Sequence, residues 1–252
     1  MKYQRTLTNV IPRPGRLGWA LAGLLLLGIA ASSSGQVLSP SSRHFGLSYA
    51  EWSAKWWQFN LGQSTDTLEV VSSGEGPGRR VRFLDSPGAS IATNDVVIHP
   101  GTFLFFPILA EWMDNGACSP SNTLTFGSLT AAELAAANAE SWSGAPVTVT
   151  TCTIDGVPVD GLSDPQTTIY LIVSPPFSYT TAEEDNVLAA LGGETCVPGG
   201  LTVYPAEAEG VYLMLAPLSP GNHSIHTVGV VGPVETPFFV QDVIYDITVA
   251  PR

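Results

Sequence analysis

The feature that most constrains the fold is a long succession of short runs rich in Val, Ile, Thr, Tyr and Phe, which begins near residue 63. Gly, Pro and Asp separate these runs, a spacing typical of strands joined by turns. Asp155-Gly156, between "TVTTCTI" and "VPV", is a strong hairpin signal. Because helical patterns are rare between the runs, we predict a mainly β protein, built as an antiparallel β-sandwich or jelly roll.

Three segments carry helical signals. Ser48 and Glu51 form a capping box, and Gly62 is a suitable end, which together predict an N-terminal amphipathic helix. Two further capping boxes predict short helices inserted between strands: Thr130 with Glu133, and Thr181 with Glu184.

The first predicted helix contains three tryptophans within six positions. Its aromatic residues are spaced by 4, 3, 4 and 3 positions, which forms one apolar stripe: Phe45, Tyr49, Trp52, Trp56 and Phe59. The stripe predicts that Trp52 and Trp56 are core residues. Trp57 lies about 100° away from Trp56, so it lies either at the edge of the contact or on the surface, where it could stack on a ligand.

The first 35 residues have the pattern of a secretory signal peptide. A basic start without acids precedes the apolar stretch "LGWALAGLLLLGIAA" and the small residues "SSSG". The alternative is a retained membrane anchor, but the apolar core is shorter than the roughly 20 residues that span a bilayer. We therefore expect residues 1–35 to be removed, residues 36–252 to form a single β-sandwich domain, and the product to be secreted, periplasmic or held at the cell surface without stable membrane insertion.

Charge restricts the partners of the mature chain. Without residues 1–35, six Lys and Arg remain against 22 Asp and Glu, a net charge near −16. Such a surface repels nucleic acid, because phosphate binding requires clustered basic side chains. An extracellular glycan or protein remains as a candidate partner.

The three cysteines suggest one disulfide and one leftover thiol, because exported proteins meet an oxidising environment. We predict the pair Cys118–Cys152. Zinc is disfavoured, since no two cysteines have ligand-like spacing.

The histidines offer a candidate site for a divalent metal. His99 and His226, paired across strands, could form a two-histidine, one-carboxylate site with an acid such as Asp95, Glu111 or Asp242. "HSIH" reads as a strand, however, where positions three apart point to opposite faces. His223 and His226 could both be ligands only if a bulge or turn lies between them. The alternative is that these are ordinary surface histidines.

Other candidate binding residues are few. Glu111 beside Trp112 follows the apolar run "TFLFFPILA", and Arg80 and Arg82 belong to a small basic cluster in an acidic chain. The first pair could contact a ligand, and the arginines could bind an anion or pair with the protein's own acids. The chain contains no G-x-S-x-G, H-E-x-x-H or P-loop pattern.

Five markers occur in order along the chain: "YAEWSAKWWQF", "HPGTFLFFPIL", "TIDGVPV", "GVYLMLAPLSPGNHSIHTVG" and "YDITV". Together they resemble an uncharacterised family of secreted bacterial proteins. The resemblance covers roughly residues 46–249 and implies an exported β-sandwich with an N-terminal Trp-rich helix. It implies no catalytic residue.

Two functions follow as hypotheses. The first is a secreted, non-catalytic β-sandwich module that binds a ligand or an extracellular partner. Exposure of Trp57, Trp112 or Trp142 on one face would favour carbohydrate, because flat aromatic faces suit sugar rings. The second is an exported metal-dependent enzyme of cupin or jelly-roll type, which requires at least three of the histidine and neighbouring carboxylate side chains to converge on one metal position.

Overall fold

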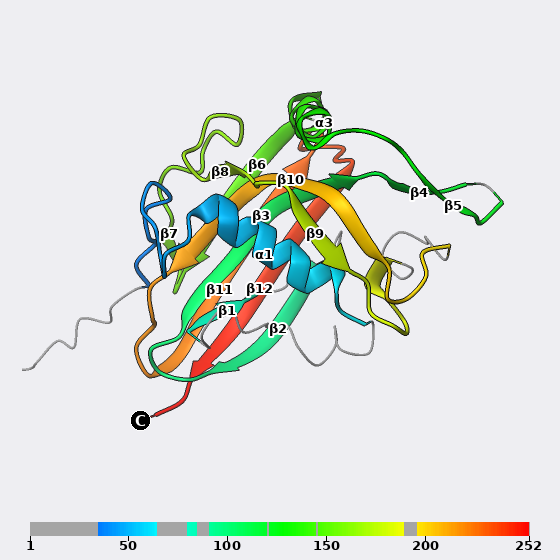
Figure 1. Cartoon of the computed structure of the whole chain (residues 1–252). Coiled ribbons are helices and arrows are strands. Elements are labelled where there is room, and N and C mark those ends of the chain that lie inside the picture. Colours follow the sequence, from blue (N-terminus) through cyan, green and yellow to red (C-terminus); the bar gives the residue numbers. More distant parts are fainter. Residues whose placement is uncertain are drawn as a thin grey trace, which may run out of the picture. The chain divides into compact units, whose positions relative to one another are not determined.

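The strand-rich pattern folds into two five-stranded sheets in the computed structural model (Figure 1). The structure describes residues 35–64, 80–84, 91–119, 121–144, 146–188 and 196–251. The predicted signal peptide, residues 1–35, therefore lies outside the described residues except for Gly35. Among the described residues, no helix is long and apolar enough to cross a bilayer.

The first sheet has the strand order β1-β3-β10-β8, and β9 also pairs with β10. Its longest pairing joins β3 and β10 in antiparallel register, with one irregularity beside Val211. The five strands are β1 (Val81–Phe83), β3 (Phe103–Asp114), β8 (Leu171–Val173), β9 (Phe177–Thr180) and β10 (Thr202–Leu215).

The second sheet has the order β2-β12-β11-β6-β7. Asp155 and Gly156 both have positive φ and connect β6 to β7, which confirms the predicted hairpin. The strands are β2 (Ile91–Ile98), β6 (Val147–Ile154), β7 (Val157–Pro158), β11 (Gly221–Val231) and β12 (Phe239–Val249). A small separate ribbon contains β4 (Gly116–Cys118) and β5 (Leu124–Phe126).

Both large sheets are mixed. The pairings β1–β3 and β12–β2 are parallel, whereas the other pairings are antiparallel. The prediction of a mainly β fold is confirmed, but a wholly antiparallel arrangement is wrong and the jelly-roll topology is not confirmed. Parallel pairs require long connections, and the sequence pattern does not reveal which distant strands these connections bring together.

Two hydrophobic cores lie on the two faces of the first sheet. One core lies between the sheets and contains Phe106, Leu213 and Tyr245, which gives a sandwich-like arrangement. The other lies beneath helix α1 (Tyr49–Leu61), which runs across the first sheet in Figure 1. The predicted capping box at Ser48 and the end at Gly62 are confirmed.

A second helix, α3 (Ala131–Gly144), lies at one end of the sandwich in Figure 1. Its predicted capping box forms, because Thr130 N donates to Glu133 Oε2 and Glu133 N donates to Thr130 Oγ1. The third predicted cap, at Thr181, is wrong: its hydroxyl donates to the Pro198 carbonyl instead. Within residues 181–188, Val187 and Leu188 alone are helical, and residues 189–195 of the predicted helix lie outside the described residues.

The disulfide joins Cys118 to Cys196, with a Cα–Cα distance of 5.8 Å. The predicted pair Cys118–Cys152 is therefore wrong. Cys152 lies on β6 with its side chain buried in the core between the sheets, whereas Cys118 lies on the separate β4–β5 ribbon. A side chain held in the core cannot reach that ribbon.

Cys152 is expected to be inert toward a thiol reagent in the folded protein. Burial raises the pKa of its thiol to about 12, so almost no reactive thiolate forms at neutral pH. Native protein should release less than a tenth of a thiol equivalent with a chromogenic disulfide reagent, and one equivalent after denaturation. Peptide mapping of the non-reduced protein should recover the Cys118–Cys196 link. Rapid labelling of native Cys152 would contradict this arrangement.

Candidate functional site

Three glutamates lie on one face of the first sheet, near the end that α3 covers. Glu209 on β10 is directly opposite Glu111 on β3, and Glu207 lies two positions away on the same strand. Residues directly opposite one another share a face, with Cβ atoms about 4.5–5.5 Å apart. Glu207 and Glu209 are only 2% and 6% exposed. The fold thus places two buried glutamates beside Glu111, which is half-buried.

Helix α3 packs on these strands through one stripe. Asn115, at the end of β3, exchanges hydrogen bonds with Leu129 just before the helix, and Ser141 Oγ near its other end donates to Glu111 Oε2 at 3.0 Å. The helix therefore runs back along β3.

The buried stripe of α3 is Leu134, Asn138 and Trp142, which lie four residues apart and share one helix face. Asn138 thus lies over the strands that carry the glutamates.

We call this region the α3 site and define it by six residues: Glu111, Asn138, Ser141, Trp142, Glu207 and Glu209. Six buried atoms of these side chains have no hydrogen-bond partner within the described part of the chain: Glu111 Oε1, Asn138 Oδ1, Asn138 Nδ2, Trp142 Nε1, Glu207 Oε2 and Glu209 Oε2. Buried polar groups in folded proteins are nearly always paired. Because these side chains come from strands and a helix that pack together, their unpaired atoms call for a polar partner at this place.

The surroundings of the three carboxyl groups oppose their ionisation as long as no cation lies beside them. Burial raises the pKa of Glu207 to about 7, against a lowering by the hydrogen bond from Ser174. Burial also raises the pKa of Glu111 and of Glu209, and the Glu111 carboxylate raises that of Glu209 further. The ion pairs of Arg43, His223 and His226, which the described ranges contain, are made with other carboxylates. The site can hold protons or accept a cation.

A cavity of about 180 Å³ lies beside Glu111 and Trp142, at the edge of the α3 site. Glu111 and Trp142 line it together with apolar residues of β3 and the second sheet: Leu109, Ala110, Val147, Val231 and Phe239. Ligand sites are usually about 300–1,000 Å³, so this cavity suits a small molecule or one group of a larger molecule.

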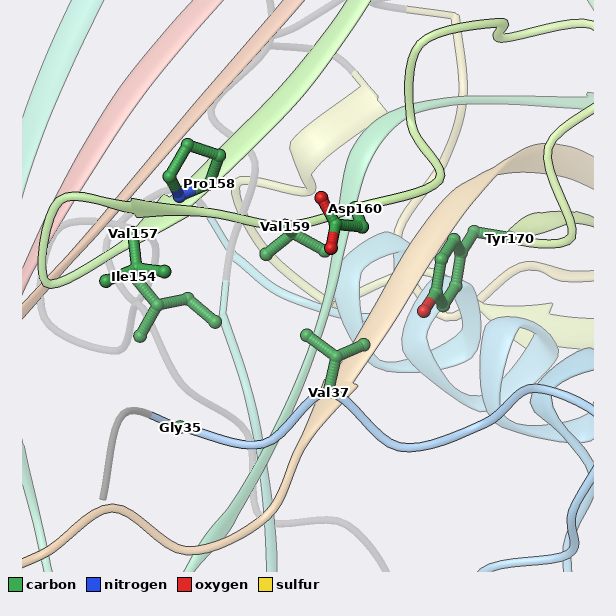
Figure 2. A pocket seen from close by; sticks show the side chains of 8 residues that line it. All are labelled: Gly35, Val37, Ile154, Val157, Pro158, Val159, Asp160 and Tyr170. Atoms are coloured by element: carbon green, nitrogen blue, oxygen red, sulfur yellow. The ribbon is translucent and has the colours of Figure 1, made fainter.

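A larger cavity, of about 250 Å³, lies between the N-terminal segment and the β6–β7 hairpin. Figure 2 shows Val37, Ile154 and Val159 around it, with the Asp160 carboxylate and the Tyr170 hydroxyl as polar groups. Its wall includes Gly35, the last residue of the predicted signal peptide. Because that wall would change on cleavage, we regard the α3 site as the stronger candidate despite its smaller cavity.

The histidines of the predicted metal site do not converge. His223 and His226 point to opposite faces of the second sheet, where His223 Nδ1 lies 2.8 Å from Asp155 Oδ2 and His226 Nε2 lies 2.7 Å from Asp242 Oδ1. His226 pairs with Ile244 of β12, and Ile244 pairs with Thr93 of β2. The exposed His99 follows the end of β2, about 20 Å from Thr93 at the rise of an extended strand. No cluster of three metal-ligating side chains occurs among the described residues.

Two of the candidate tryptophans are buried. Trp57 is buried and donates from Nε1 to the Tyr212 hydroxyl at 2.8 Å. Trp142 is buried on the stripe of α3 that packs against the first sheet. Trp112 is half-buried and packs against Trp57 beneath α1. Neighbouring strand residues point to opposite faces, so Glu111 and Trp112 do not form one site. The aromatic neighbour of Glu111 is Trp142.

The arginines lie at the other end of the sheet. Arg82 on β1 pairs with Leu104 of β3, seven residues before Glu111, a separation of about 23 Å along the strand. Exposed Arg80 lies just before β1. Neither belongs to the α3 site.

Glu111 and Trp142 are candidate residues from the sequence, whereas Asn138, Ser141, Glu207 and Glu209 are not predicted by it. A signal for the last two was present in "AEAEGVYLML", where Glu207 and Glu209 continue the alternation of Val211, Leu213 and Leu215. Residues two apart share a strand face, so the alternation predicts that both glutamates lie on the same face as these core residues. Asn138 and Ser141 had no comparable signal.

Comparison of the chain with protein families, with curated proteins and with solved structures finds no match in any of the three. The resemblance to a family of secreted bacterial proteins therefore remains an expectation from the sequence, and the function has to be argued from the site.

Proposed function

We propose that this protein is a secreted, non-catalytic β-sandwich module that binds a small polar ligand at the α3 site. The observation that carries the proposal is the group of six buried, unpaired polar atoms in the α3 site. Two of the side chains that carry these atoms, Glu111 and Trp142, also line a cavity of about 180 Å³. Four of the six atoms are acceptors and two are donors, which a polar ligand could satisfy together. Leaving each of them unpaired costs about 1–3 kcal/mol.

The cost of this arrangement supports a binding role over a purely structural one. Apolar side chains of similar shape would fill the same space without the penalty for unpaired polar groups. Binding sites commonly retain such groups because a ligand, and not the rest of the protein, provides their partners. Secretion is supported by the leader pattern, and the Cys118–Cys196 disulfide suits an oxidising compartment.

Thermal unfolding of residues 36–252 in a panel of small amines, amino alcohols, polyols and carboxylic acids tests this proposal. We expect at least one compound to raise the melting temperature by several degrees, since binding to the folded state adds stability. Val231→Trp would fill the cavity and should abolish the shift. Val228→Trp is the matched control, because Val228 is half-buried on the same strand but does not line the cavity.

A shift that survives in Val231→Trp would place binding elsewhere and overturn the proposal. A panel that leaves the wild-type melting temperature unchanged throughout would also overturn it.

A further inference from the structure

The α3 site has a composition that selects one class of ligand. We infer that it binds a small organic amine that carries a neighbouring hydroxyl group, with the ammonium group held by Glu111, Glu207 and Glu209. This inference rests on the proposed function and adds the chemistry of the ligand.

The three glutamates are the reason to expect a positive charge on the ligand. Glu111 and Glu209 are direct cross-strand partners, and like charges in that position repel each other. Each of the three carboxyl groups has one buried oxygen without a donor. The ion pairs seen within the described ranges join Arg43 to Glu51, His223 to Asp155 and His226 to Asp242, and so involve none of these glutamates. A bound ammonium group would remove the repulsion and supply three N–H donors.

Asn138 supports a bound ligand independently of the glutamates, because its side-chain amide is neutral and the argument from charge does not apply to it. It is 0% exposed, lies on the stripe of α3 that faces the glutamates, and has both amide atoms unpaired. Asn138 Oδ1 can accept from the ammonium group. Asn138 Nδ2 and Trp142 Nε1 are donors that require an acceptor, which a hydroxyl oxygen beside the amine would provide.

Other occupants satisfy the site less well. Water can pair with both donors and acceptors, but it does not balance buried carboxylates. A metal ion needs ligand atoms that converge at about 2.0–2.6 Å, and no group of three metal-ligating side chains among the described residues is so placed. Charge-assisted hydrogen bonds of about 2.7–2.9 Å suit the wider spacing around an ammonium group.

Titration calorimetry and thermal unfolding with ethanolamine at pH 7.5 would test the inference, with ethylene glycol as the neutral analogue. We expect ethanolamine to bind and to raise the melting temperature, and ethylene glycol to do neither at equal concentration. Glu209→Gln should weaken ethanolamine binding at least tenfold, and Glu111→Gln should do the same if the first variant does not fold. Glu140→Gln is the control, because Glu140 is exposed on α3.

The outcomes separate the two claims. If neutral compounds bind in a manner sensitive to Val231→Trp while ethanolamine does not, the binding function stands and the ammonium class is overturned. If ethanolamine binds equally well to wild type and Glu209→Gln, the role of the glutamates is overturned. If neither ethanolamine nor any neutral compound binds, both claims fall.

Discussion

The free energy of unfolding is expected to fall as the pH rises from about 4.5 to about 7, by roughly 3 kcal/mol from Glu207 alone. The pKa of Glu207 rises from 4.5 to about 7 on folding, and each pKa unit corresponds to about 1.4 kcal/mol. Between these values the folded protein retains a proton that the unfolded chain has lost. Stability increases with pH only where the unfolded state binds more protons, so here it decreases.

Urea denaturation at half-unit pH intervals from 4.5 to 8 would measure this slope. Glu207→Gln should flatten it, because a neutral amide loses no proton, and should raise stability most above pH 7. Glu140→Gln, on the exposed face of α3, should leave the slope unchanged. Carboxylates whose pKa is lowered, such as Glu51 and Glu133, lose their contribution only below about pH 4.5. A profile of Glu207→Gln identical to wild type would contradict the burial of Glu207.

Replacing Trp52 by alanine is expected to cost about 3–5 kcal/mol of stability, the usual range for large aromatic residues in a core. Trp52 is fully buried, contacts Phe83 and Phe105, and donates from Nε1 to the His44 carbonyl at 3.0 Å. Alanine would leave a cavity between α1 and the first sheet. The melting temperature should drop by about 10 °C, as measured by circular dichroism.

Trp52→Phe serves as the control, because it retains an aromatic ring and loses the hydrogen bond and part of the volume. It should cost less than half as much as alanine. Equal losses in the two variants would mean that the hydrogen bond to His44, and not packing, holds α1 in place. A loss below 1 kcal/mol for alanine would contradict the assignment of Trp52 to the core.

Under the proposed function, the α3 site would link the stability of the protein to ligand binding. Asn138 and the three glutamates lower the stability of the ligand-free protein, since they bury polar atoms without partners. An occupant that supplies those partners would recover the loss on binding. Substitutions that stabilise the empty protein at this site are therefore the ones we expect to weaken ligand binding.

The sequence by itself determined the local elements. The helix at residues 49–61, its capping box and the buried stripe of Trp52 and Trp56 follow from side-chain spacing, because neighbours along a helix interact over three or four residues. The Asp155-Gly156 hairpin is similarly local, since its two residues adopt the positive φ that such turns require.

Only the tertiary structure decided which distant residues meet. The opposition of Glu111 and Glu209 depends on the register of β3 and β10, and the contact of Asn138 and Ser141 with those strands depends on how α3 packs. The pairing of Cys118 with Cys196, and the separation of His99 from His226, have the same origin. Strand register and helix docking follow from burial summed over the whole core, which no short segment of the chain encodes.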